Sequence, residues 1–147
     1  MAQPMPYEFM VRYTPQREWI DRQGILVWLA LFFIELGAGM FVVSSIFGNL
    51  LGMLIGWLIC AILGGGCHLL YLGHPIRFWR VLLSSGWKTS WISRGLYFVI
   101  TFLALGLVHM ALTQWMAPAV GLLLAADVFA FLSVIYAGFA LAYVSGL

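Results

Sequence analysis

Residues 50–72 read LLGMLIGWLICAILGGGCHLLYL, an apolar run that contains no Asp, Glu, Lys or Arg. At about 1.5 Å of helical rise per residue, a run of this length crosses the ~30 Å hydrocarbon core of a bilayer. Similar apolar runs cover 24–47, 92–113 and 118–144. Because a span in lipid must satisfy its own backbone polar groups, we expect four transmembrane helices in an up-down bundle. The sequence predicts an all-α polytopic membrane protein with one membrane domain over 1–147.

The distribution of charge predicts an orientation. The chain is 64% hydrophobic and 8% charged, with a mean hydropathy of +1.03. Its seven basic residues lie in the N-terminal tail 1–23, in the basic loop 73–91 or next to that loop: Arg12, Arg17, Arg22, Arg77, Arg80, Lys88 and Arg94. With four spans, both segments share one side with the C-terminus, and the positive-inside rule makes that side cytoplasmic. A charged partner protein is an alternative explanation for the asymmetry.

Glycines mark places where helices are expected to approach closely. Gly48, Gly52 and Gly56 repeat every four residues, and small residues on one helix face allow close packing in lipid. The triplet Gly64–Gly66 weakens its helix by about 1 kcal/mol per glycine relative to alanine. We expect this spot to admit a ligand or a close neighbour just before His68.

The histidines and cysteines do not form a recognisable metal or haem site. His68 lies near the basic end of the second span, whereas His109 lies about 25 Å from that end of the third. One haem cannot be bound by both, and no metal-ligand spacing is present. Cys60 and Cys67 lie about 10 Å apart on one helix, beyond disulfide reach. We therefore expect no haem, no metal and no disulfide.

Two acidic residues fall within predicted spans. Helical rise places Glu35 about 16 Å from the basic side and Asp127 about 14 Å from the opposite side, so both are near the midplane. One alternative is a proton path through the two carboxyl groups. The other is a pair of protonated carboxyls that form hydrogen bonds to neighbouring helices, for example through Ser44 or Tyr136. The sequence leaves both open.

A cluster of polar and aromatic residues at the basic end of the second span has the composition of a quinone site. His68 and Tyr71 are three residues apart on one helix face, so we expect both to face one pocket. The candidate quinone-binding residues are His68, Tyr71, His74, Arg77 and Trp79. Quinone carbonyls need hydrogen-bond donors, the ring stacks on an aromatic side chain, and histidine exchanges protons near neutral pH.

The basic loop has a second interpretation. Pro75 suits the first turn of a short interfacial helix that would run to Leu83 and present Arg77 and Arg80. Without any ligand, these arginines could simply extend to lipid phosphates.

The motif residues of this loop carry a family resemblance. The stretch 68–83, HLLYLGHPIRFWRVLL, and the stretch 90–95, SWISRG, resemble the signature of the polysulfide reductase (NrfD-type) membrane subunit family. The dimethyl sulfoxide reductase anchor subunit is related. The segment 35–41, ELGAGMF, is also similar to that family's small-residue motif. Tyr71 stands where the family has an acid or histidine, and His74 stands where it has arginine.

The resemblance implies a haem-free, quinone-reactive subunit of a prokaryotic cytoplasmic membrane. It implies docking of an iron–sulfur subunit, which in turn contacts a molybdenum or tungsten enzyme, with electrons passing between a cluster and menaquinone or ubiquinone. The residues expected to dock the partner are Arg77, Arg80, Lys88 and Arg94. Family members have eight or more spans in two four-helix halves, and this chain matches the first half. A second membrane subunit or a second copy would complete such an assembly.

The sequence thus favours a quinone-redox subunit that does not itself act on a soluble substrate, because it contains no nucleophile–base pair. Its expected contacts are lipids and redox partners, with no nucleic acid. Two alternatives stay open. The chain could be a purely structural membrane anchor for a soluble redox enzyme, or a proton-conducting subunit that uses Glu35 and Asp127.

Overall fold

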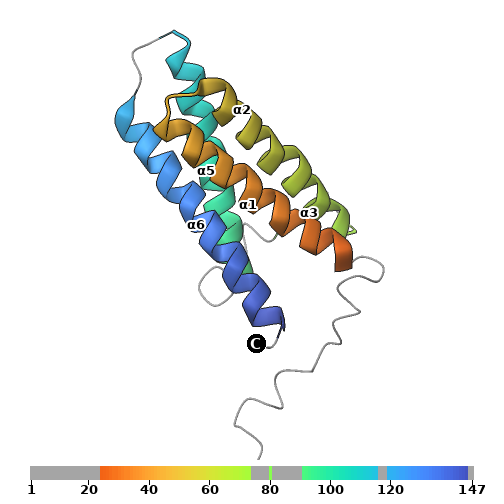
Figure 1. Cartoon of the computed structure of the whole chain (residues 1–147). Helices are drawn as coiled ribbons and strands as arrows, with labels where there is room; N and C mark the ends of the chain where they lie inside the picture. The colour runs from red at the N-terminus through yellow and green to blue at the C-terminus, as the bar shows by residue number, and fades with distance from the viewer. Residues whose placement is uncertain (1–23, 74–79, 81–90, 116–118, 146–147) are drawn as a thin grey trace, which may run out of the picture.

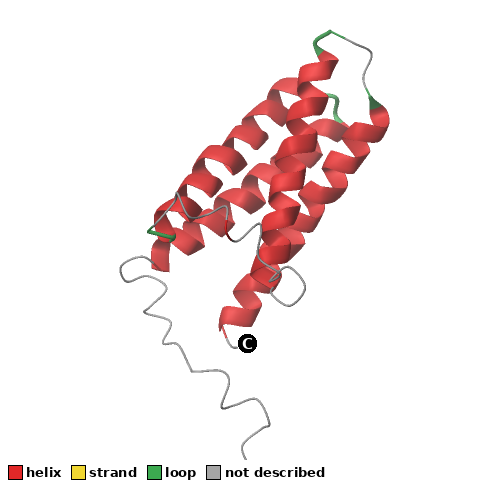
Figure 2. Ribbon diagram, turned by 180° about the vertical axis from the view of Figure 1, so that it is seen from behind, coloured by secondary structure: helices red, strands yellow, loops and turns green. Residues whose placement is uncertain are grey.

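The computed structural model describes residues 24–73, 80, 91–115 and 119–145, and all regular structure in these ranges is helical (Figures 1 and 2). The predicted N-terminal tail lies outside the described residues. So does the predicted interfacial helix from Pro75 to Leu83, apart from Arg80.

The bundle consists of four antiparallel rods, a rod being one helix or an unbroken series of helices. The first is α1 (Gly24–Ile46), and the second joins α2 (Leu50–Leu58), the π-helix η2 (Ile59–Gly64) and α3 (Gly65–Tyr71). The third and fourth are α5 (Trp91–Thr113) and α6 (Val120–Ser145). Each described rod is long and apolar enough to cross a membrane. The start of α1 and the end of α6 lie at the same end of the bundle (Figure 1).

A tight turn holds α1 against the second rod. After α1 ends, Gly48 adopts a φ of +63°, a left-handed conformation that costs glycine little. The side chain of Asn49 accepts a hydrogen bond of 3.0 Å from the backbone N–H of Gly52 and so caps the start of α2. This short connection forces the two rods to be antiparallel neighbours.

Glycines bring the backbones of α1 and the second rod together, as the sequence predicts for Gly52 and Gly56. A Cβ on Gly56 would lie 2.7 Å from the carbonyl oxygen of Gly37, and one on Gly37 would lie 2.5 Å from that of Gly56. At Gly52, the space that a Cβ would need is occupied by the side chain of Ser44. Gly48 belongs to the turn instead and has nothing within 4 Å of its Cβ position.

The π-helix keeps one face of the second rod on α1. The buried small residues Gly52, Gly56, Cys60 and Gly64 are spaced by four. In an α-helix of 3.6 residues per turn, each step of four rotates about 40° past a full turn, so the face drifts away. A wider π turn, with i to i+5 hydrogen bonds, offsets that drift. The triplet Gly64–Gly66 is expected to admit a ligand or a close neighbour, and Gly64 does have one, because a Cβ there would lie 2.8 Å from the side chain of Ile34.

The interior and the exterior of the bundle are both apolar. Phe41 of α1 and Phe102 of α5 are fully buried and meet edge to face, with ring centroids 5.0 Å apart. Large apolar side chains also cover the outside, for example along α6 at Val120, Leu124, Val128, Phe131 and Ile135. Helices that are apolar on all faces are typical of membrane spans.

Candidate functional site

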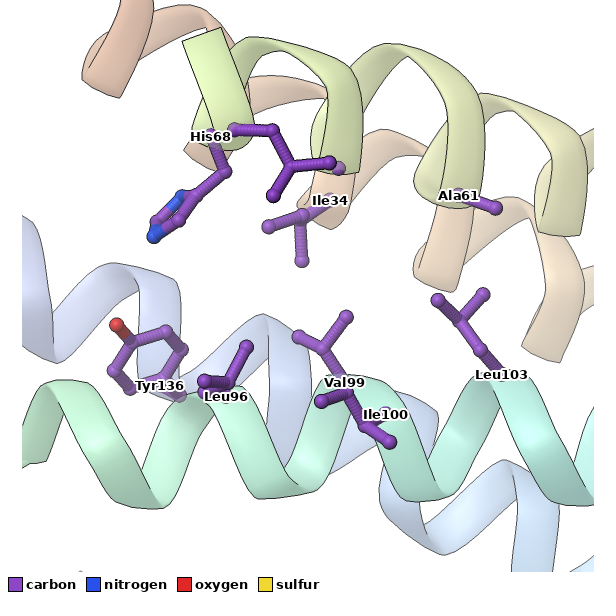
Figure 3. A pocket seen from close by; sticks show the side chains of 10 residues that line it. Ile34, Ala61, His68, Leu96, Val99, Ile100, Leu103 and Tyr136 are labelled. Carbon is purple, nitrogen blue, oxygen red and sulfur yellow. The ribbon is translucent and has the colours of Figure 1, made fainter. Parts of the chain in front are cut away.

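A cavity of about 200 Å³ lies within the bundle, between the second rod and α5 (Figure 3). All four rods contribute to its lining, which consists of Ile34, Ala61, Gly65, His68, Leu69, Leu96, Val99, Ile100, Leu103 and Tyr136. The cavity is partly open to the surface of the bundle.

Two polar side chains face this apolar space. Among the described residues of the lining, only His68 and Tyr136 carry polar side-chain atoms. Figure 3 shows the imidazole of His68 and the phenol hydroxyl of Tyr136 at the same end of the cavity, extending toward each other from α3 and α6. The Nδ1 atom of His68 is buried and has no hydrogen-bond partner within the described part of the chain. The cavity therefore offers a titratable ring nitrogen and a hydroxyl to an apolar occupant.

Local packing fixes the position of Tyr136. Its side chain is 5% exposed and packs in a small cluster with Leu31 and Ala137. A Cβ on Gly95 of α5 would overlap the ring of Tyr136, so only glycine leaves room for the ring at this position. The ring of Tyr136 on α6 therefore packs directly against α5 at Gly95.

One end of the gap between the second rod and α5 is closed. The indole N–H of Trp57 donates a 2.8 Å hydrogen bond to the backbone carbonyl of Leu103, which itself lines the cavity. Gly106, one turn further along α5, has the indole of Trp57 and the ring of Phe41 3.3 Å from its Cβ position. The cavity lies between the two rods on the α3 side of this closure.

Of the residues that the sequence groups around His68, the structure describes Tyr71, Arg80 and Arg94. Tyr71 is 41% exposed and does not line the cavity, although it lies three residues from His68. Arg80 is exposed, and Arg94 is partly buried near the start of α5. The remaining predicted residues, His74, Arg77, Trp79 and Lys88, lie outside the described residues.

The two acidic residues of the spans do not meet. Asp127 Oδ2 accepts a 2.8 Å hydrogen bond from the hydroxyl of Ser45, near the end of α1, so its partner is the residue after Ser44. Glu35 is ten residues earlier on α1, about 15 Å away along the helix axis. It is partly buried one position after Ile34, and it does not line the cavity. A direct proton transfer between Glu35 and Asp127 is excluded by this separation.

His68 and His109 lie toward opposite ends of the bundle, on α3 and α5. His68 lines the cavity, whereas His109 lies near the far end of α5, where Thr113 is its neighbour. Cys60 and Cys67 are both free. Within the described residues, no group of three or more His, Cys, Asp or Glu side chains is arranged to hold a metal ion.

The sequence did not predict the lining residues of α5, and it suggested Tyr136 only as a hydrogen-bond partner of a buried carboxyl group. Tyr136 lies 68 residues after His68, and nothing in local spacing joins them. The sequence contained one relevant signal, Gly95, because a glycine inside a helix often leaves room for a large side chain of a neighbouring helix. Which side chain fills that room depends on the register of α5 against α6, which the sequence does not give.

Comparisons with known proteins identify no relative. No family model matches the chain, nor does any curated protein or solved structure. The geometry and chemistry of the cavity are therefore the basis for assigning a function.

Proposed function

We propose that this chain is a quinone-reactive membrane subunit and that the cavity between the second rod and α5 binds the quinone headgroup. The observation that carries the proposal is an apolar, ring-sized cavity with His68 and Tyr136 at one end. Small-molecule sites are typically apolar with a few polar groups that fix orientation.

The size and opening of the cavity suit a ring with a tail. An apolar cavity of ~150 Å³ can hold benzene. The space here, about 200 Å³, is large enough for a ring headgroup and too small for a prenyl chain as well. Because the cavity is partly open, the chain of a lipid quinone would remain outside, against the apolar surface of the bundle.

The two polar residues match the chemistry of the headgroup. Reduction of a quinone to a quinol consumes two electrons and two protons, and the protons go to the two carbonyl oxygens. The Tyr136 hydroxyl donates a hydrogen bond to one carbonyl oxygen and so fixes the ring. The imidazole of His68 lies at the same end, where it donates one of the two protons to that carbonyl oxygen in one direction of the reaction and accepts it in the other. The second proton belongs to the carbonyl oxygen on the opposite side of the ring, and it would be exchanged with a group other than these two side chains.

The electrons would come from, or pass to, a partner. On this proposal the chain operates in a prokaryotic cytoplasmic membrane and contacts an iron–sulfur subunit through its basic side. That subunit would join it to a molybdenum or tungsten enzyme. The arginine-rich motif and its resemblance to the NrfD-type family support this assignment, and a second membrane subunit or a second copy would complete the assembly.

Quinone binding tests the proposal against a purely structural anchor. In lipid nanodiscs, a short-chain quinone should bind the full chain, and His68→Ala and Tyr136→Phe should each weaken binding about threefold to tenfold. A net loss of ~1 kcal/mol per hydrogen bond corresponds to this range. Equilibrium dialysis measures the affinity.

Tyr71→Phe is the matched control, since it removes a tyrosine hydroxyl that lies outside the cavity. Its affinity should equal that of the unmodified chain. Equal affinities for all variants, or no saturable binding at all, would favour the structural anchor over the quinone subunit.

A further inference from the structure

The π-helix η2 borders the cavity and changes the backbone hydrogen bonding of the second rod there. Ala61, within η2, and Gly65, at the start of α3, both line the cavity. In an α-helix, the N–H of Gly65 would donate to the carbonyl oxygen of Ala61, four residues earlier. Here it donates to the carbonyl oxygens of Cys60 and Ile62 instead. The carbonyl of Ala61 therefore lacks the partner that an α-helix would give it.

The next N–H along the rod does not replace that partner. The N–H of Gly66 lies five residues after Ala61, so a bond between them would continue the π-helix past Gly64, where it ends. Backbone carbonyls away from water are almost always paired. An open carbonyl beside a cavity thus points to a donor on the occupant of the cavity.

Gly65 leaves this carbonyl accessible from the cavity. A helix carbonyl points along the axis toward the residue four positions later, so the Ala61 oxygen lies on the face that Ala61 and Gly65 share. Beyond its chain neighbours and the nearby backbone of its own helix, the Cβ position of Gly65 has only the Cys60 carbonyl oxygen, at 3.9 Å, within 4 Å among the described residues. No side chain fills this space, so an occupant can approach the backbone.

We propose that the backbone carbonyl of Ala61 accepts a hydrogen bond from the second hydroxyl of a bound quinol. The inference rests on the proposed quinone site and names the group that meets the oxygen opposite His68 and Tyr136. Ala61 precedes His68 by seven residues, about 10 Å along the rod, and Figure 3 shows them toward different ends of the cavity. A quinol held at one oxygen by His68 and Tyr136 therefore has its other hydroxyl toward Ala61.

A carbonyl acceptor distinguishes the two redox forms of the ligand. It pairs with a quinol hydroxyl, whereas a quinone would place its own carbonyl oxygen, also an acceptor, against that of Ala61. His68 and Tyr136 do not make this distinction, because each side chain can donate or accept. We expect the cavity to bind quinol about threefold to tenfold more tightly than quinone, the effect of one hydrogen bond. The carbonyl positions the hydroxyl and takes up no proton.

Binding of both redox forms to the full chain in lipid nanodiscs tests the proposal. Equilibrium dialysis with a short-chain quinone, and with its quinol under argon, measures the ratio of the two affinities. Deletion of Ile62, whose side chain is 62% exposed, removes the extra residue of the π turn. Gly65 then lies four residues after Cys60, and the N–H of Gly66 comes within α-helical reach of the Ala61 carbonyl. The preference for quinol should disappear, while quinone affinity changes little.

Gly65→Ala tests the same carbonyl without a deletion, by covering it with a methyl group. Lost space in the cavity would weaken both redox forms alike, whereas a covered acceptor weakens quinol binding alone, so the affinity ratio should fall toward one. Gly66→Ala is the matched control, because Gly66 does not line the cavity and has nothing within 4 Å of its Cβ position. Its ratio should equal that of the unmodified chain.

The possible results separate this inference from the proposed function. Equal affinities for quinol and quinone in the unmodified chain would overturn the role of Ala61 and leave the quinone site intact. A preference for quinol that survives in both Gly65→Ala and the folded Ile62 deletion would do the same. Saturable binding of neither form would overturn both proposals. Circular dichroism shows whether each variant is folded, and Gly65→Ala decides if the deletion variant is not.

Discussion

Ala61→Phe is expected to abolish quinone binding while the bundle stays folded. The Ala61 side chain projects into the cavity from η2, and a phenyl group there would occupy most of the ring-sized space. Because the cavity can accept the added volume, the usual cost of overpacking a filled core, ~1–3 kcal/mol, should be largely avoided. We expect quinone affinity to fall by at least about 100-fold, since an excluded headgroup loses all its contacts.

Ala104→Phe is the matched control for this experiment. Ala104 lies on α5, one residue beyond Leu103, and its side chain is exposed on the outside of the bundle. The same chemical change there should leave both the affinity and the melting temperature as they are in the unmodified chain. An unchanged affinity in Ala61→Phe would show that quinone binds somewhere else.

Gly56→Val is expected to destabilise the packing of the second rod against α1 strongly. The new side chain would meet backbone atoms, namely the carbonyl oxygen of Gly37 at 2.7 Å and the amide nitrogen of Phe41 at 2.8 Å from Cβ. Backbone cannot move aside as the end of a flexible side chain can, so the rods must separate. We expect the free energy of unfolding to fall by about 3 kcal/mol.

Gly39→Val isolates the effect of packing from that of helix propensity. Gly39 is on α1 and has nothing within 4 Å of its Cβ position. Because valine favours helix over glycine slightly, this variant should be as stable as the unmodified chain or more so. Unfolding in mild detergent, titrated with a denaturing detergent, measures both. Equal stability of Gly56→Val and Gly39→Val would contradict the close approach of the two rods.

Much of the fold could be predicted from the sequence, because length and hydropathy determine a membrane span locally. The four apolar runs correspond to four rods whose ends differ from the predicted ends by at most two residues. The packing role of Gly52 and Gly56 also follows from local spacing. The π turn could not be predicted in this way. It keeps residues spaced by four in contact with α1, and that contact depends on how the two rods pack.

The candidate site could be predicted only in part. Helical spacing suggested that His68 and Tyr71 share a pocket, but the orientation of the second rod places Tyr71 on the outside. The partner of His68 is Tyr136, from a different rod. In the same way, equal depth suggested that Glu35 and Asp127 belong together. The register of α6 against α1 instead places Asp127 next to Ser45. Register between rods is a long-range property that one sequence does not specify.

The most direct test of the quinone site is photolabelling of the full chain in nanodiscs with a photoreactive quinone, followed by peptide mass spectrometry. We predict that the label attaches to cavity residues, chiefly between Leu96 and Leu103 on α5 and between Ala61 and Leu69 on the second rod. Excess unlabelled quinone and Ala61→Phe should each remove the label. Label on the outer faces of the rods, or label that neither treatment reduces, would contradict a quinone site in this cavity.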